Sequence, residues 1–388
     1  VLSMIYFDNA ATSFPNPLCV RRAPLDAIPY YGGNPGRSGH ALSMRAAEKV
    51  FGVREQAAAF FGAPPENVIF TLNCTMALNL AIKGILSRGG HAVISSLEHN
   101  SVVRPLHALR EAGTADYSVA EVRELDPEQT VRNFRAALRT DTRAIICTAA
   151  SNLTGVILPL QELSALCREY GLLFVVDAAQ GAGVLPIHMQ ELGIDILCTA
   201  GHKGLYGTTG TGLLILREGV MLDTVLEGGT GSTSLELEQP DFYPDRLESG
   251  TVNTVGILSL GAGLRFVSHL TPAAIYRREF LLCRYVWREL CLMPGVELLP
   301  RSFCPGEKAP IVSFNLRGED SAAVASALSR RGFALRGGFH CAALAHRQLG
   351  TTGQGAVRFS PSHFNTDQQL LLFLNEMKKI QKNGCKSG

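Results

Sequence analysis

The chain has 388 residues, of which 46% are hydrophobic and 18% charged, and its formal net charge is +2. These values are typical of a soluble globular protein, exclude intrinsic disorder, and at this length predict two domains. A net charge near zero without a strongly basic block gives no reason to expect nucleic acid or a membrane surface as a partner. No apolar run approaches the roughly 18 residues of a membrane-spanning helix, and we expect no secretory signal.

Ten cysteines lie at irregular spacings without a C-x-x-C pair. In a chain of this size, the pattern indicates reduced thiols in a cytoplasmic protein. It predicts neither a disulfide framework nor a metal site.

Apolar strands alternate with helices over the first part of the chain. After a short strand and a small-residue turn at 6–12, Pro and Gly dominate as far as Gly39. Helices are predicted at 43–61, from 73, from 98, at 127–138 and at 159–170. Strands are predicted at 68–71, 92–95, near 117, and at 143–148, 172–177, 194–199 and 212–216. This alternation predicts a mostly parallel sheet with helices on both faces.

The pattern changes after a loop-rich stretch at 219–250. A helix at 255–269 resembles a linker. Beyond it we expect strands near 296, at 311–315, up to 336 and at 356–359, with helices at 322–331 and from 366. This order predicts a smaller α+β domain.

Several polar residues follow the strand-like runs of the first part. In open sheets of this kind, ligands bind beyond the carboxyl ends of the strands. The residues so placed are Thr75, His99, Asn152, Asp177, Gln180 and Lys203. Each has an ordinary alternative, such as a helix N-cap for Thr75, a helix start for His99 or a surface position for Lys203.

Lys203 and Asp177 together suggest pyridoxal phosphate (PLP) chemistry. Such a site needs a lysine that forms a Schiff base and an acid that keeps the pyridinium nitrogen protonated. Lys203 lies behind a histidine between glycine-bearing turns, and Asp177 ends a strand-like run. Their joint occurrence favours PLP more than either residue does alone.

Cys341 is a candidate nucleophile in a glycine-bearing loop near Arg336, His340 and His346. Cationic neighbours can lower the pKa of a thiol and make it reactive. The alternative is that Cys341 is one of several structural cysteines. Arg358, in a predicted strand, suits a substrate carboxylate through bidentate pairing, or is a plain surface arginine.

The combined motifs resemble those of the cysteine desulfurases and selenocysteine lyases, in the class V branch of fold-type I PLP enzymes. The resemblance covers nearly the whole chain. Its most specific pieces are Glu98-His-Asn100, Val176-Asp-Ala-Ala-Gln180, Gly201-His-Lys203, Glu248-Ser-Gly-Thr-Val-Asn253 and Arg336-Gly-Gly-Phe-His-Cys341. It implies a large PLP-binding domain at 13–260 with a mostly parallel seven-stranded sheet. A smaller α+β domain, formed by 1–12 and 261–388, would carry the Cys341 loop.

The resemblance also implies residue roles. Lys203 would bond to PLP, Asp177 would pair with the pyridinium nitrogen, and His99, also a candidate catalytic residue, would stack on the ring. Gln180 would contact the phenolic oxygen. The phosphate would be held by Thr75 and His202, with Thr251 from the partner subunit of a homodimer, and Cys74 would also contact the cofactor. The substrate would be bound by Asn152, Arg358, Arg336 and Ala11.

The implied reaction removes sulfur from L-cysteine, giving L-alanine and a persulfide on Cys341. The short interval between Cys341 and Arg358 is similar to that of the family branch with a short cysteine loop, whose members tend to need a separate sulfur-accepting protein. Selenocysteine lyase, cysteine sulfinate desulfinase, class V aminotransferase and a non-catalytic interaction protein stay open as alternatives. The sequence does not say whether the product serves iron–sulfur clusters, thio-modified RNA or selenium metabolism.

The chain departs from the family pattern at Ala200, where relatives usually carry a phosphate-binding Ser or Thr. Thr199 is adjacent, but in a regular strand its side chain points elsewhere.

Overall fold

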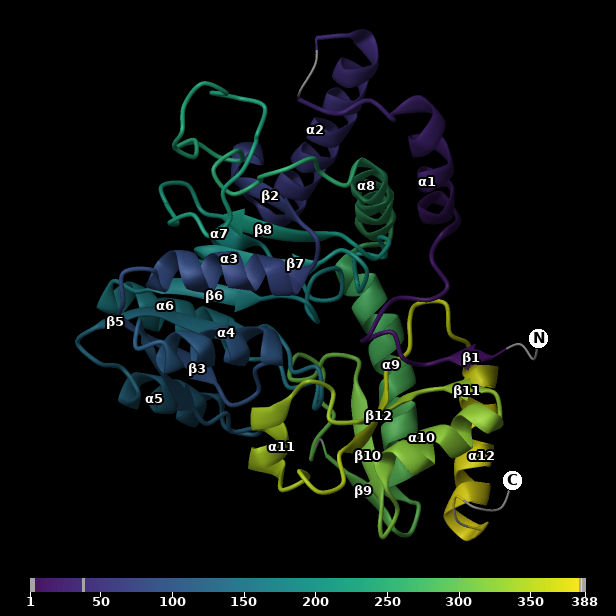
Figure 1. The fold of residues 1–388 in the computed structure, drawn as a ribbon. Coiled ribbons are helices and arrows are strands. Elements are labelled where there is room, and N and C mark those ends of the chain that lie inside the picture. The colour runs from purple at the N-terminus through teal and green to yellow at the C-terminus, as the bar shows by residue number, and fades with distance from the viewer. Residues whose placement is uncertain (1–3, 37–38, 300, 384, 386–388) are drawn as a thin grey trace.

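The fold centres on a seven-stranded sheet, seen in a computed structural model that describes residues 4–36, 39–299, 301–383 and 385 (Figure 1). In spatial order its strands are β2 (Val68–Thr71), β8 (Gly212–Leu216), β7 (Ile196–Ala200), β6 (Leu173–Asp177), β5 (Thr142–Thr148), β3 (His91–Ser95) and β4 (Asp116–Ala120). Only β8 runs opposite to the others. The carboxyl ends of β2, β3, β5, β6 and β7 therefore share one edge, and the predicted mostly parallel sheet is confirmed.

Helices cover both faces of the sheet (Figure 1). One face packs against α3 (Cys74–Leu86) and α4 (Asn100–Glu111). The other packs against α2 (Ala41–Phe61), α5 (Pro127–Ala136), α6 (Leu160–Tyr170), α7 (Met189–Leu192) and α8 (Thr254–Leu270). The central strands are buried nearly throughout, as a sheet covered on both faces requires.

The C-terminal part has its own core around a four-stranded antiparallel sheet. Its strand order is β12 (Arg336–Gly338), β13 (Ala356–Phe359), β10 (Val312–Leu316) and β9 (Val296–Leu298). The helices of this part are α9 (Pro272–Cys291), α10 (Ser321–Arg330), α11 (Ala343–Leu349) and α12 (Asp367–Asn383). β1 (Ile5–Tyr6) pairs with β11 (Phe333–Ala334), so the N-terminal segment joins this part. The expected division at 260/261 falls inside α8 and stays a prediction.

Four helices were missed by the sequence patterns, the short α7 and α11 and the longer α1 and α9. The Pro- and Gly-dominated stretch contains α1 (Leu18–Tyr30), which holds two internal prolines that local propensity disfavours. The helix α9 lies where no element was predicted, and its charged residues interrupt the apolar period. The helix α8 is no linker, because it packs against both α1 and α2.

Among the described residues, no helix combines the length and the apolar character needed to span a membrane.

Candidate active site

A cavity of about 180 Å³ lies at the carboxyl edge of the large sheet. It brings together eight residues predicted from the sequence: Cys74, Thr75, His99, Asn152, Asp177, Gln180, His202 and Lys203. The remaining wall consists of Asn73, Ser101, Thr148, Ala179 and Ala200. Residues from five strand ends thus meet at one point, because those strands run in the same direction.

Lys203 follows β7 and forms part of the cavity wall. Its backbone carbonyl accepts hydrogen bonds from the Ser13 hydroxyl at 2.6 Å and the Tyr206 amide at 2.8 Å. Removal of water from around the ammonium group lowers the pKa of Lys203, and the nearby Asp177 partly opposes this shift. A lysine in this environment deprotonates more readily than one on the surface.

Asp177 ends β6 and is buried. Its Oδ1 accepts a hydrogen bond from the Ala179 amide at 2.9 Å and from the Cys74 thiol at 3.4 Å. Burial and the Asp177 charge raise the pKa of Cys74 well above its usual value, so this thiol stays protonated and donates. The site therefore offers a fixed carboxylate opposite the lysine.

His99 is the N-cap of α4, which confirms the helix-start interpretation, and it also lines the cavity. Its Nδ1 accepts from the Ser101 amide at 3.0 Å, which leaves the proton of the neutral ring on Nε2. Burial lowers the pKa of His99 to about 4, so the ring is neutral at physiological pH. A neutral ring can stack on a flat cofactor without adding charge.

The start of α3 forms another part of the wall. The N-cap is Asn73, whose side chain accepts from the Met76 amide at 2.9 Å, so the N-cap alternative for Thr75 is wrong. The Thr75 hydroxyl instead bonds to Ser101 Oγ at 2.7 Å. The free N–H groups at a helix start bind phosphate well.

Ala200 lines the cavity, so this wall position offers no hydroxyl. The neighbouring Thr199 donates to the Ala178 carbonyl at 3.3 Å and does not form part of the wall. The expectation that Thr199 points elsewhere is confirmed.

The groups present fit PLP. A lysine, a buried carboxylate, a neutral ring and a helix N-terminus surround one cavity, and these complement an aldehyde, a pyridinium nitrogen, a flat ring and a phosphate. Two buried wall atoms, Asn152 Oδ1 and His202 Nδ1, have no hydrogen-bond partner among the described residues. Buried polar atoms are normally bonded, so both are available to a ligand.

Gln180 is tied to the N-terminal segment, because its Nε2 donates to the Ala10 carbonyl at 2.9 Å. Ala11 itself is not on the cavity wall.

Arg358, on β13, connects the C-terminal part to this wall. It donates to Asp8 Oδ1 at 2.8 Å and to the Asn152 carbonyl at 3.0 Å. Because it is 1% exposed, the surface interpretation of Arg358 is wrong. Its Nε has no partner within the described part of the chain. Arg336 stands opposite Arg358 in the β12–β13 register, outside the wall.

Cys341 lies beside the mouth of the cavity. It is exposed, and it lines a second cavity of about 400 Å³ that shares Thr75, His99 and Ser101 with the first. Its backbone adopts a left-handed conformation with φ of 54°. The Cys341 carbonyl accepts from the Asn100 amide at 2.8 Å, which ties the loop to the start of α4.

The expectation that histidines supply positive charge beside Cys341 is wrong. His340 and His346 are both buried. Burial lowers the pKa of His340 to about 3 and also lowers the pKa of His346. Both rings are therefore neutral at physiological pH.

Thr251 is exposed and does not reach this cavity within the single chain. Its hydroxyl accepts from Asn34 Nδ2 at 3.4 Å. The sequence patterns also missed Asn73 and Ser101 on the wall. Their positions at the starts of α3 and α4 were the available signal.

The fold and this cavity agree with a known enzyme class. Residues 5–373 match the family model of "Aminotransferase class-V", and the chain belongs to this family. Membership makes it a PLP-dependent enzyme, as predicted from the motifs.

Individual relatives of the chain within this family are named as cysteine desulfurases. A protein of Methanothermobacter thermautotrophicus named "Probable cysteine desulfurase" is 30% identical over 98% of this chain and 95% of its own length. A protein of Mycolicibacterium paratuberculosis with the same name is 31% identical over 99% of this chain, which spans 56% of that longer protein. The solved apo structure of cysteine desulfurase from Thermococcus onnurineus NA1 is similar with a TM-score of 0.90 and 32% identity, covering 98% of this chain and 95% of that one. The predicted resemblance to cysteine desulfurases is confirmed.

Proposed function

We propose that this enzyme is a cysteine desulfurase that converts L-cysteine to L-alanine and keeps the sulfur as a persulfide on Cys341. The observation that carries the proposal is the position of Cys341. Its exposed thiol lines a cavity that shares three wall residues with the cavity of Lys203. A nucleophile beside the mouth can meet the sulfur of a substrate bound next to the lysine.

The proposed cofactor contacts follow from the wall. Lys203 binds PLP, Asp177 holds the pyridinium nitrogen and His99 stacks on the ring. Gln180 reaches the phenolic oxygen, the start of α3 with Thr75 and His202 holds the phosphate, and Cys74 contributes to the cofactor site through its hydrogen bond to Asp177. When bound, PLP supplies an electron sink that stabilises negative charge at the substrate Cα.

The protein groups supply the rest of the chemistry. Arg358 orients the substrate carboxylate through its Nε–H, which has no partner among the described residues, and Asn152, whose Nδ2 donates to the His340 carbonyl, binds the substrate through Oδ1, which can accept from the amino group. Arg336 and Ala11 complete the proposed substrate site.

The lowered pKa of Lys203 suits it to remove the Cα proton as a general base. The Cys341 thiolate then attacks the substrate sulfur, so that an S–S bond forms and the substrate C–S bond breaks. The carbon keeps the electron pair and takes a proton to become the methyl group of alanine, so no outside oxidant is needed.

Flexible loops often bring a reactive group to its substrate and withdraw it afterwards. The Cys341 loop would have to do so, because its thiol then passes the sulfur to an acceptor. A separate sulfur-accepting protein is part of this proposal. The free thiols of the chain suit a reducing compartment, and we propose the cytoplasm.

A homodimer is also part of the proposal. Large apolar side chains on α1 and α2 are exposed to solvent: Leu18, Leu25, Ile28, Tyr30, Leu42, Met44 and Phe51. The two helices stand beside α8 at one end of the molecule (Figure 1). Exposed apolar faces of this extent mark association surfaces. A twofold contact there would let Thr251 reach the phosphate site of the partner.

The test is an amino-acid panel with purified protein and added PLP. L-Cysteine, L-selenocysteine and L-cysteine sulfinate are offered, and alanine is measured together with sulfide, selenide or sulfite. We expect Cys341→Ala to lose at least about a hundredfold of its activity on cysteine and to keep its activity on selenocysteine. Full sulfide release by Cys341→Ala would contradict the persulfide role. A keto acid in place of alanine would indicate an aminotransferase.

A further inference from the structure

The backbone turn that carries Lys203 is closed by Tyr206, three residues further along the chain. The Tyr206 amide donates to the Lys203 carbonyl at 2.8 Å, and the Tyr206 backbone is left-handed with φ of 57°. A bulky residue keeps this conformation only where its surroundings hold it. The contacts of the Tyr206 side chain therefore bear on the position of the lysine.

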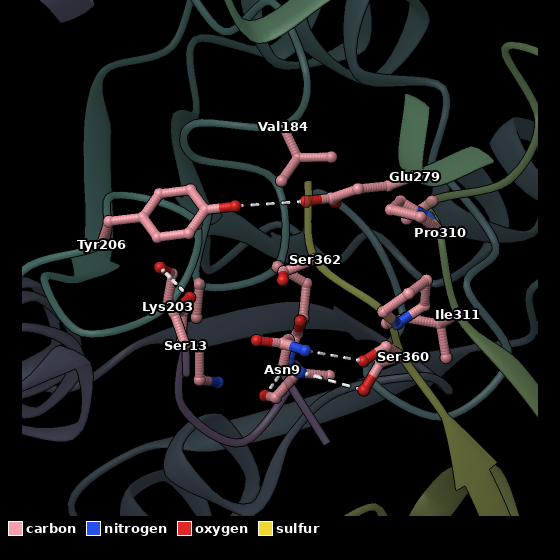
Figure 2. A pocket seen from close by; sticks show the side chains of 16 residues that line it. Asn9, Ser13, Val184, Lys203, Tyr206, Glu279, Pro310, Ile311, Ser360 and Ser362 are labelled. Atoms are coloured by element: carbon pink, nitrogen blue, oxygen red, sulfur yellow. Dashed lines mark hydrogen bonds between the residues drawn. The ribbon is translucent and has the colours of Figure 1, made fainter. Parts of the chain in front are cut away.

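Those contacts come from distant parts of the chain. The Tyr206 ring is 1% exposed and meets Phe266 and Phe364 edge-on, with centroids 5.2 and 5.9 Å away. Its hydroxyl points at Glu279 Oε1, 3.4 Å away, on α9 (Figure 2). The backbone of His363 lies beside both groups and acts to lower their pKa values. His363 follows the strand of Arg358, so the lysine turn, α9 and this strand meet here.

Glu279 is an unusual residue for this position, because it is only 5% exposed and has no cationic partner among the described residues. Burial raises the pKa of its carboxyl group to about 8. The titratable groups around it are Tyr206, Cys283 one turn further along α9, and Lys203 across a shared cavity. Burial also raises the pKa of Tyr206 and of Cys283. Glu279, Tyr206 and Cys283 are therefore mainly protonated and uncharged at physiological pH.

The shared cavity has a volume of about 40 Å³ and lies between Lys203, Tyr206 and Glu279 (Figure 2). It also touches Ala179 and Gln180, which line the larger cavity as well. The space exceeds the roughly 10–15 Å³ that one water needs. At 3.4 Å the direct contact is long for an O–H···O bond, and a water here could complete it.

We propose that Glu279 is a positioning residue for the PLP-binding lysine and that it acts through Tyr206. The carboxyl group fixes the tyrosine hydroxyl, the tyrosine keeps the turn closed, and the turn sets where the lysine amine stands. In this way α9 of the C-terminal part supports a residue of the large sheet. The proposal rests on the assignment of Lys203 as that lysine.

The experiment compares PLP-loaded variants. Glu279→Gln keeps a neutral hydrogen-bonding group, whereas Glu279→Leu and Tyr206→Phe remove one side of the contact. Leu282→Ala is the matched control, because Leu282 is buried on the same helix but does not line the cavity between Tyr206 and Glu279. The readouts are the PLP dissociation constant, the pH titration of the visible absorbance of lysine-bound PLP, and the thermal midpoint.

We expect PLP binding about five- to tenfold weaker in Glu279→Leu and Tyr206→Phe, the factor that one hydrogen bond typically gives. Their absorbance titrations should shift together, and Glu279→Gln should match the wild type. Leu282→Ala should lower the thermal midpoint without moving the titration.

A second measurement serves if Glu279→Leu does not fold. A buried carboxyl group with a raised pKa favours the folded state at low pH, and this contribution is lost as pH rises through about 8. The free energy of unfolding of the wild type should therefore fall as pH rises from about 4.5 to about 8, and that of Glu279→Gln should fall less.

Two outcomes would overturn the proposal in different ways. If the wild-type spectrum equals that of Lys203→Ala, the lysine assignment fails, and the positioning role fails with it. If that spectrum is normal but Glu279→Leu titrates like the wild type, or no differently from Leu282→Ala, only the positioning role is wrong.

Discussion

Arg358→Gln separates a structural from a substrate-binding contribution of one buried arginine. Arg358 bonds to Asp8 and to the Asn152 carbonyl, and its Nε is left without a partner among the described residues. Removing one member of a buried ion pair costs about 3–5 kcal/mol of unfolding free energy. Asp8 is 19% exposed, so solvent offsets part of that cost, and we expect about 2–3 kcal/mol.

The effect on catalysis is predicted separately. A charge-assisted hydrogen bond to the substrate carboxylate is worth about 1.5–3 kcal/mol, which corresponds to a loss of about 10- to 150-fold in kcat/KM. Most of this loss should fall on KM, because the carboxylate contact is made in both the ground and transition states. Steady-state kinetics on L-cysteine and urea unfolding of the same samples give the two numbers.

Asp8→Asn is the matched control, because it removes the ion pair while leaving the arginine in place. We expect a larger loss of unfolding free energy, about 3–5 kcal/mol, because the buried Arg358 is left without its ion-pair partner, and a change in kcat/KM of less than about threefold. A substrate-binding role for Arg358 is refuted if Arg358→Gln retains kcat/KM within threefold while its stability falls. It is equally refuted if Asp8→Asn loses as much kcat/KM as Arg358→Gln.

Three further predictions concern the cofactor site and its support. Ala200→Ser should tighten PLP binding about fivefold by adding a hydroxyl to the wall, measured by equilibrium dialysis; unchanged affinity would place the phosphate elsewhere. Arg54→Leu should cost about 3–5 kcal/mol in urea unfolding, because Glu248 would lose its partner at 2.7 Å; a cost below 1 kcal/mol would contradict this. Burial lowers the pKa of several histidines, and three of them have values of about 4 or below, so their protonation disfavours the folded state. Each therefore lowers the stability of the PLP-free protein as pH drops from about 6.5 toward 4, by up to about 1.4 kcal/mol per pH unit, while the raised pKa values of Glu98 and Glu279 act in the opposite direction. The histidine contribution is the difference between the wild type and His340→Gln; identical pH dependence of their thermal midpoints would contradict it. These histidines are His99, His202 and His340.

The residues at the carboxyl edge of the sheet could be predicted because the pattern that places them lies within short stretches of sequence. An apolar strand followed by a polar residue is visible in the sequence, and parallel strands must bring such residues to one edge. Thr75, His99, Asp177 and Lys203 are found together for this reason. The family motifs then gave the order of chemical roles, which the fold alone does not carry.

What could not be predicted depends on contacts between distant segments. Arg358 is surrounded by Asp8 and Asn152, and nothing near it in the sequence indicates that it is buried. The same holds for His340, which was expected to be a cationic neighbour of Cys341 but is neutral because it is buried. The helix α9 was missed, and with it Glu279, since its charged residues obscure the apolar stripe that packs on the core.

The most direct test of the account is the location of the sulfur after one turnover. PLP-loaded enzyme is mixed with L-cysteine without reductant or acceptor, and the alanine formed and the masses of its proteolytic peptides are measured. The account predicts about one alanine per subunit and a peptide containing Cys341 that is heavier by one sulfur atom, a gain that Cys341→Ala abolishes. Alanine formed with the added sulfur on another cysteine, or with none on the protein, would contradict it.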